Sequence, residues 1–164
     1  MLEKFRNRIG KRGMALVELM VALALLGLIS TAIVSFSAVV SAHVESQQNQ
    51  YAFLEESTQI RDNLSAWLSQ MDENGAVCTV AADNLSVPAY GASAAFDGED
   101  FVLTHRDGTV SRVETDTLTR VQFTRKELSN GDSIVKCTLT GAHNRNERYA
   151  QSFVLYLRCG SFAG

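Results

Sequence analysis

The chain has 164 residues, of which 46% are hydrophobic and 20% charged, with one proline and three cysteines. This length holds one ordinary globular domain plus a tail, and the composition excludes collagen, a low-complexity linker and a disulfide-dense scaffold. The net charge of −3 divides into +4 for residues 1–13 and −7 for residues 14–164. A basic N-terminal segment followed by an acidic remainder argues against a nucleic-acid-binding protein, because such a protein has its positive charge along a face of the folded domain.

A long uncharged segment follows the basic tip. Residues 19–42 contain no Asp, Glu, Lys, Arg or His. As a helix this segment is about 36 Å long, which is enough to cross a hydrocarbon core of about 30 Å with some tilt. It is also longer than the apolar region of a secretory signal peptide. We therefore expect a single membrane-spanning helix, with residues 1–13 in the cytoplasm and the chain after Ala42 outside.

Glu18 is the one charged residue near the start of this segment. An ionised side chain at membrane depth costs about 2.5–3.5 kcal/mol on insertion scales, so a compensating partner is expected. Around it, Lys11-Arg12-Gly13 followed by Met14-Ala15-Leu16-Val17-Glu18 resembles the leader and N-terminal motif of type IV prepilins and pseudopilins. Two departures are a methionine at position 14, where the family most often has phenylalanine, and the lack of a proline in the apolar run.

The resemblance implies a processing event and a set of partners. In the family, a membrane peptidase cuts after the glycine and methylates the new N-terminus, which implies cleavage between Gly13 and Met14 and an N-methylated Met14. It also implies that Glu18 is the assembly carboxylate, paired with the new amine in its own chain or in a neighbouring subunit, where an apolar surround strengthens the attraction. The implied partners are a prepilin peptidase, other pilins or pseudopilins, an assembly platform protein, an ATPase and membrane lipid, with no cofactor and no nucleic acid.

Beyond the membrane segment the sequence keeps a helical period. Within residues 43–71, six residues follow one another at alternating spacings of four and three positions: Phe53, Ser57, Ile60, Leu64, Trp67 and Met71. This spacing predicts an amphipathic helix that continues the membrane helix, ends at Gly75 and packs its stripe against a sheet.

After Gly75 the pattern changes to short alternating runs, which predict strands. The expected strands cover residues 76–81, 101–104, 110–115, 118–125, 134–140 and 149–159, with turns at Asp107-Gly108 and Asn130-Gly131. We expect them to form an antiparallel meander on the amphipathic helix. Residues 82–100, rich in Ala, Gly, Ser and Asp around Pro88, are expected to be an irregular loop.

Cys78, Cys137 and Cys159 all lie outside the membrane in this topology, where a disulfide is permitted. Their odd number leaves at least one thiol free or paired between chains. In a simple hairpin of residues 134–140 and 149–159, Cys137 falls opposite about residue 151, too far from Cys159 to bridge. The C-terminal cysteine loop common among pilins instead implies a Cys137–Cys159 pair, and three buried thiols are a further alternative. The spacings give no zinc signature.

Three short matches to active or metal sites carry little weight. Ser133-Ile134-Val135-Lys136 fits the Ser-x-x-Lys pattern of penicillin-recognising enzymes, but on a strand the serine and lysine point to opposite faces. Residues 91–95 lack the second glycine of a nucleophile elbow and are expected to be loop. Asp97-Gly98-Glu99-Asp100 lacks the spaced ligands of a calcium loop, and His43, His105 and His143 show no metal spacing.

These features together predict an α+β fold, in which a long N-terminal helix packs on a C-terminal antiparallel sheet. The expected divisions are a removed leader (1–13), an assembly helix (14–42), its amphipathic continuation (43–75) and an extracytoplasmic sheet domain (76–164). The leading hypothesis is a non-enzymatic structural subunit, a minor pilin or pseudopilin, of a type IV pilus-like filament or of a type II secretion or competence pseudopilus in the inner membrane. The alternatives are a signal-anchored binding domain and, with least support, a hydrolase.

Overall fold

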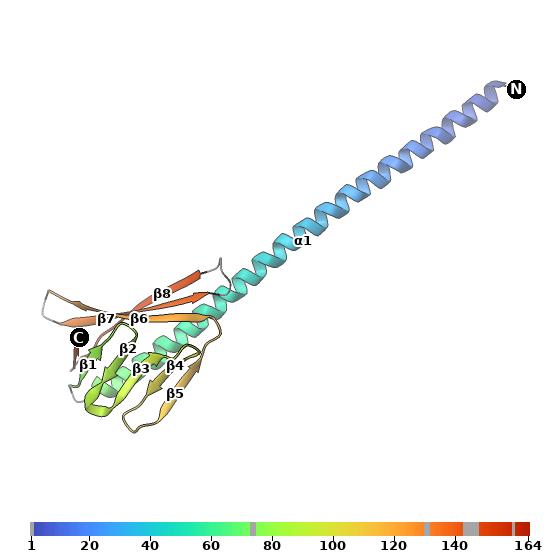
Figure 1. Cartoon of the computed structure of the whole chain (residues 1–164). Coiled ribbons are helices and arrows are strands. Elements are labelled where there is room, and N and C mark those ends of the chain that lie inside the picture. The colour runs from blue at the N-terminus through green and yellow to red at the C-terminus, as the bar shows by residue number, and fades with distance from the viewer. Residues whose placement is uncertain (1, 73–74, 130–131, 143–147, 159) are drawn as a thin grey trace. The chain divides into compact units, whose positions relative to one another are not determined.

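The computed structural model describes residues 2–72, 75–129, 132–142, 148–158 and 160–164, with side chains from residue 16 onward (Figure 1). It has the predicted α+β architecture: one long helix, α1 (Leu2–Asp72), is followed by strands and a short 3-10 helix. By its internal contacts the chain divides into two compact units, Met1–Glu45 and Ser46–Gly164.

The strands of the second unit form two sheets. The six-stranded sheet has the order β5-β4-β3-β2-β1-β9, and the three-stranded sheet has the order β6-β7-β8. Their bounds are β1 (Val77–Val80), β2 (Asn84–Val87), β3 (Ala92–Phe96), β4 (Asp100–Thr104), β5 (Val110–Glu114), β6 (Leu118–Glu127), β7 (Ser133–Ala142), β8 (Arg148–Leu155) and β9 (Ser161–Ala163).

The predicted single meander is wrong in two respects. The chain leaves the first sheet between β5 and β6, and β9 returns to pair in parallel with β1, with Cys78 opposite Phe162. At the first of these points the Glu56 carboxylate of α1 accepts hydrogen bonds from the backbone N–H groups of Asp116 and Thr117, at 3.0 and 3.2 Å. These bonds hold the connection between β5 and β6 against the helix at the point where the chain passes from one sheet to the other.

The irregular loop predicted for residues 82–100 is also wrong. This region contains β2, β3 and a 3-10 helix, η1 (Pro88–Tyr90), between them. Pro88 begins the turn and Gly91, at φ 65°, ends it in the left-handed region that glycine tolerates. The buried positions of the two strands pair Leu85 with Ala94 and Val87 with Ala92, so each large side chain lies beside a small one.

The predicted amphipathic stripe of α1 is confirmed as the centre of the core. All six predicted positions are at most 3% exposed, and Leu68 joins them. They pack with the inward residues of both sheets, which include Leu85, Phe101, Leu103, Val121, Phe123, Val135, Leu139 and Leu155. The helix ends at Asp72, whose carbonyl accepts the N–H of Gly75 at 3.3 Å, and Gly75 has the positive φ of 65° typical of a C-terminal cap.

Two side chains of α1 fasten its end to distant segments. The indole Nε1–H of Trp67 donates to the carbonyl oxygen of Thr104 at 2.9 Å, which joins the helix to the end of β4. The carboxylate of Asp72 accepts the backbone N–H groups of Arg158 and Gly160, at 2.5 and 2.7 Å. These bonds satisfy polar groups that the sheets leave unpaired, so the helix end and the segment before β9 are held together.

The predicted turns and strand registers can be compared with the structure. The Asp107-Gly108 turn is confirmed: Gly108 has φ 82°, and Asp107 accepts the N–H of Thr109 at 2.9 Å. Asn130-Gly131 lies outside the described residues. The pairing of Cys137 with about residue 151 is wrong, because β7 extends to Ala142 and this register places Cys137 opposite Phe153.

Candidate assembly site

The first unit presents an exposed apolar surface. Every large apolar side chain from Leu16 to Val44 is exposed, from 41% at Val40 to 70% at Phe36. From Leu16 onward α1 is long and apolar enough to cross a membrane, by length and composition. An exposed apolar surface of this extent is unfavourable in water and is typical of a segment that meets lipid or other helices.

Polar side chains within this surface are satisfied inside the helix. The hydroxyl of Ser30 donates to the carbonyl of Leu26, and that of Ser35 donates to the carbonyl of Thr31, at 2.8 and 2.9 Å. Thr31 itself donates to the carbonyl of Leu28 at 2.8 Å. Because each hydroxyl has a partner in its own helix, these residues cost little in an apolar environment.

Glu18 differs from these hydroxyls. It is exposed on α1 among apolar neighbours, and the described residues of its own unit offer no Lys or Arg side chain with which it makes an ion pair. Gly13 and Met14 precede Glu18 in the same helix, α1. A carboxylate in an apolar surround is stable when a cation is brought to it.

The cysteines give no reactive centre among the described residues. Cys78 and Cys137 are free, buried thiols, and burial raises the pKa of each to about 12. Since the thiolate is the nucleophile and metal ligand, both side chains are inert near neutral pH. Cys159 lies outside the described residues.

The two enzyme-like matches are accounted for by strand structure. Ser133 and Lys136 both lie on β7, as predicted, and the Ser133 hydroxyl donates to the carbonyl of Phe162 at 3.3 Å instead of facing the lysine. Residues 92–96, expected to be loop, form β3. A nucleophile elbow needs a strand-to-helix turn, and here Gly91 leads from a 3-10 helix into a strand.

The acidic group of residues 97–100 is held by protein partners. The N–H groups of Asp100 and Glu99 bind the Asp97 carboxylate at 2.8 and 3.0 Å, and Arg112 pairs with it at 2.9 Å. These bonds, the two backbone ones first, lower the pKa of Asp97. In the parts of the chain whose side chains are described, no group of three or more His, Cys, Asp and Glu residues is placed to hold a metal ion.

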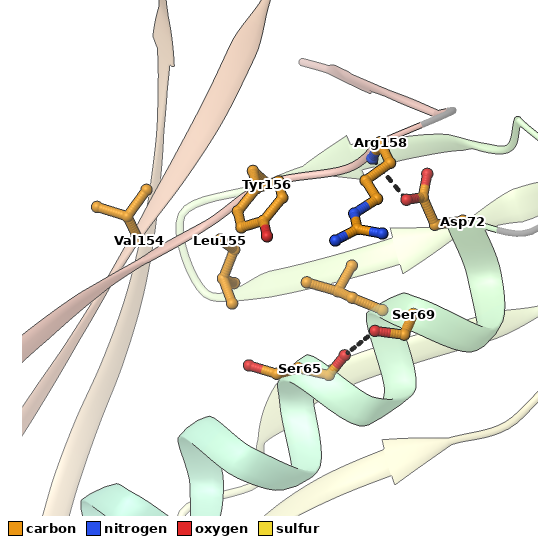
Figure 2. Close-up of a pocket in the computed structure, with 8 residues that line it drawn as sticks. Ser65, Ser69, Asp72, Val154, Leu155, Tyr156 and Arg158 are labelled. Carbon is orange, nitrogen blue, oxygen red and sulfur yellow. Dashed lines mark hydrogen bonds between the residues drawn. The ribbon is translucent and has the colours of Figure 1, made fainter.

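A groove of about 610 Å³ lies between α1 and the end of β8 (Figure 2). Its polar groups are largely occupied. The Ser69 hydroxyl donates to the Ser65 carbonyl at 2.9 Å, and Asp72 holds the backbone N–H of Arg158. The guanidinium of Arg158 and the ring of Tyr156 lie beside the groove in Figure 2. The groove contains no pair of nucleophile and base, so its residues do not support hydrolysis.

Comparison with known proteins assigns the N-terminal segment. Residues 8–34 match the family model of the prokaryotic N-terminal methylation motif. The chain thus carries the type IV prepilin-like signal predicted from its sequence, and this motif supports a type IV pilin-like protein of structural type. No curated protein and no solved structure matches the chain. The motif and the long apolar helix fit a protein anchored in the inner membrane by a single span.

Sequence reasoning found the N-terminal site but missed features of the second unit. It did not single out Glu56, whose carboxylate also accepts the hydroxyl of Thr117 at 2.7 Å. Nor did it identify Arg112 as the cation that neutralises Asp97. Both contacts join residues far apart in the sequence, and no local pattern signals them.

Proposed function

We propose that this chain is a minor pilin or pseudopilin, a structural subunit of a type IV pilus-like filament or of a secretion or competence pseudopilus. A prepilin peptidase removes residues 1–13 and the new N-terminus at Met14 is methylated. Residues 14–42 then serve first as a membrane anchor and afterwards as the helix that packs against neighbouring subunits. An assembly platform protein and a cytoplasmic ATPase supply the work of extraction from the membrane.

The observation that carries the proposal is the coincidence of three features in one segment. The matched methylation motif covers residues 8–34, Glu18 lies four residues after Met14, and the surrounding apolar surface is exposed. A simple signal anchor needs only the apolar run, and the charge of Glu18 makes insertion of such an anchor into the membrane less favourable. In a filament, the methylated amine of one subunit pairs with Glu18 of another in a surround of low dielectric, which fixes the register between helices.

Incorporation of Glu18 variants into filaments tests this role. Glu18→Gln keeps the size of the side chain and removes its charge, so the protein should enter the membrane and be processed normally but be depleted from sheared filaments or from cross-linked pseudopilus assemblies. Thr31→Val is the matched control: it also removes a polar group from the apolar segment, but its hydroxyl is bonded only within α1. Equal incorporation of the Gln variant and the parent chain would remove the role assigned to Glu18.

A further inference from the structure

The sequence of the second unit divides into an acidic segment and a basic segment. Residues 76–117, which contain β1–β5, hold seven carboxylates and two arginines, for a net charge of −5. Residues 118–164, which contain β6–β9, hold seven Lys or Arg residues and three carboxylates, for a net charge of +4. Such a separation creates a local field that the net charge of the chain conceals.

The positive charge gathers on the outward face of the three-stranded sheet. We call this surface the basic face and define it by Arg120, Lys126, Lys136 and Arg148. All four are exposed. The strand register places all four on one side of the sheet. Arg120 and Ala150 both lie opposite Thr140, and Lys136 lies opposite Thr124 and Val154. Lys126 lies opposite Ile134, and Arg148 lies opposite Ala142. The other outward residues of these strands are uncharged.

No residue of the basic face has an ion-pair partner in the part of the chain whose side chains are described. The ion pairs among the described residues use Arg61, Arg112 and Arg125, and none involves a residue of the basic face. Four cations on one flat sheet face without a carboxylate repel one another, and an anionic partner that covers them relieves this repulsion.

A complementary acidic surface lies on the other sheet. Two shallow clefts of about 530 and 520 Å³ share Glu114 and Asp116 as lining residues. Glu55 lines the first and Glu99 the second. We call these four residues the acidic cleft. All four are exposed, and within the described residues none of them makes an ion pair.

The nearby groups of the acidic cleft are already engaged. Arg112, which lines the first cleft, is held by Asp97 and Asp100 at 2.9 and 3.5 Å. Glu56, in the same cleft, is bound to the backbone of Asp116 and Thr117. The four carboxylates of the acidic cleft therefore remain available to a cation from outside the chain.

The basic face and the acidic cleft involve different sheets of the molecule. Figure 1 shows β8 and β5, the edge strands of the two sheets, on opposite sides of the C-terminal half of α1. A chain cannot bring its own basic face to its own acidic cleft, but it can present each to a different neighbour. A contact between two unlike surfaces is heterologous, so each copy presents one surface to one neighbour and the other surface to another.

We propose that the basic face docks against the acidic cleft of a second copy of this chain. The inference rests on the proposed filament role and adds a contact between extracytoplasmic domains to the contact between helices. A second copy fits better than a long polyanion, because residues 43–75 and residues 76–117 each carry a net charge of −5 and would repel a polymer that extends beyond the basic face.

Cross-linking of the detergent-extracted full chain tests the contact. Copies labelled with ¹⁴N and ¹⁵N are mixed and treated with a carbodiimide, which joins a lysine amine to a carboxylate with loss of water. The expected products link Lys126 or Lys136 of one isotope to a carboxylate of the acidic cleft of the other. Their yield should fall at 1 M salt, where the screening length is about 3 Å instead of about 10 Å at 0.1 M. No mixed-isotope product, or a yield independent of salt, overturns the proposal.

A charge exchange gives the sharper test. Copies with two different tags are co-purified. Lys136→Glu with Arg148→Glu, and separately Glu114→Lys with Asp116→Lys, should each lower self-association about tenfold, because the altered surface then has no net charge with which to attract its partner. Mixing the two variants brings the unaltered acidic cleft of the first together with the unaltered basic face of the second and should restore co-purification. Asp83→Lys, outside both clefts, is the control and should associate as the parent does.

The outcomes separate this proposal from the filament role. Failure of the mixed variants to associate, with each variant folded by its Trp67 fluorescence, overturns the docking of the basic face. Binding to vesicles of anionic lipid without cross-links between copies overturns it as well. Processing at Gly13 is measured in the same samples: cross-links in a chain that keeps residues 1–13 support the docking proposal while they count against the filament role.

Discussion

Gly141 is a position where the packing of α1 against the sheets leaves no room for a side chain. It lies on β7, and a Cβ atom added there would be 2.5 Å from Cδ2 and 2.7 Å from Cε2 of Phe53, and 2.9 Å from the carbonyl oxygen of Thr117. The Phe53 ring is also stacked on Tyr149, with ring centroids 5.6 Å apart, which limits its movement. Gly141→Ala should therefore force either the ring or the backbone to move.

The expected cost follows from two opposing effects. Overpacking of a core costs about 1–3 kcal/mol, and the backbone contact with Thr117 places this site in the upper half of that range. Gly141 is not among the glycines with positive φ, so alanine also stabilises by about 0.4–1 kcal/mol through the unfolded state. The net loss in the free energy of unfolding is about 1–2 kcal/mol, or about 0.5–1 M in the urea midpoint for a slope of about 2 kcal/mol/M.

Trp67 provides the assay, since it is the single tryptophan of the chain and is fully buried. Its fluorescence in urea reports the unfolding of the second unit in the detergent-solubilised protein. Gly27→Ala, which meets nothing within 4 Å, is the matched control and should leave this transition unchanged. Adding Phe53→Leu should recover part of the loss caused by Gly141→Ala, because the two sites share one contact. Additive losses, or no loss from Gly141→Ala, would refute the packing argument.

Three further predictions use the same protein. Glu56→Gln should lower the free energy of unfolding by about 1.5–3 kcal/mol, because the charged acceptor of the Thr117 hydroxyl and backbone N–H is lost; an unchanged urea midpoint contradicts this. Ser57→Ala should leave stability equal or raise it by up to about 1 kcal/mol, because its buried hydroxyl has no partner among the described residues, and a clear loss would reveal a partner. Cys78 and Cys137, whose pKa values are raised to about 12, should resist alkylation at pH 8 until urea unfolds the second unit, as mass spectrometry of peptides would show.

Local periodicity carried the prediction of the helix but not of the sheets. The stripe from Phe53 to Met71 repeats with the helical period, so it could be recognised before any partner was known. The strands β2 and β3 were missed because their inward residues alternate over only four or five positions, and Ala92 and Ala94 carry little hydrophobic signal. Their burial depends on Leu85 and Val87 across the strand pair, which is tertiary information.

Long-range contacts account for the other differences. The connection between the two sheets contacts Glu56, which lies 60 and 61 positions earlier in the chain than the residues it binds. The basic face combines residues spread from Arg120 to Arg148, and these share a surface only through the register of β6, β7 and β8. By contrast, the N-terminal signal is contiguous, with Gly13, Met14 and Glu18 at fixed spacing, and could be read directly from the sequence.

The mass of the mature N-terminus tests the central claim most directly. The protein is extracted from membranes of cells with and without an active prepilin peptidase, and its N-terminal peptide is sequenced by mass spectrometry. The proposed function predicts a chain that begins at N-methylated Met14 when the peptidase is present and at Met1 when it is absent. A chain that begins at Met1 in both, or that is cut near residues 38–43, would contradict the assignment as a processed pilin-like subunit.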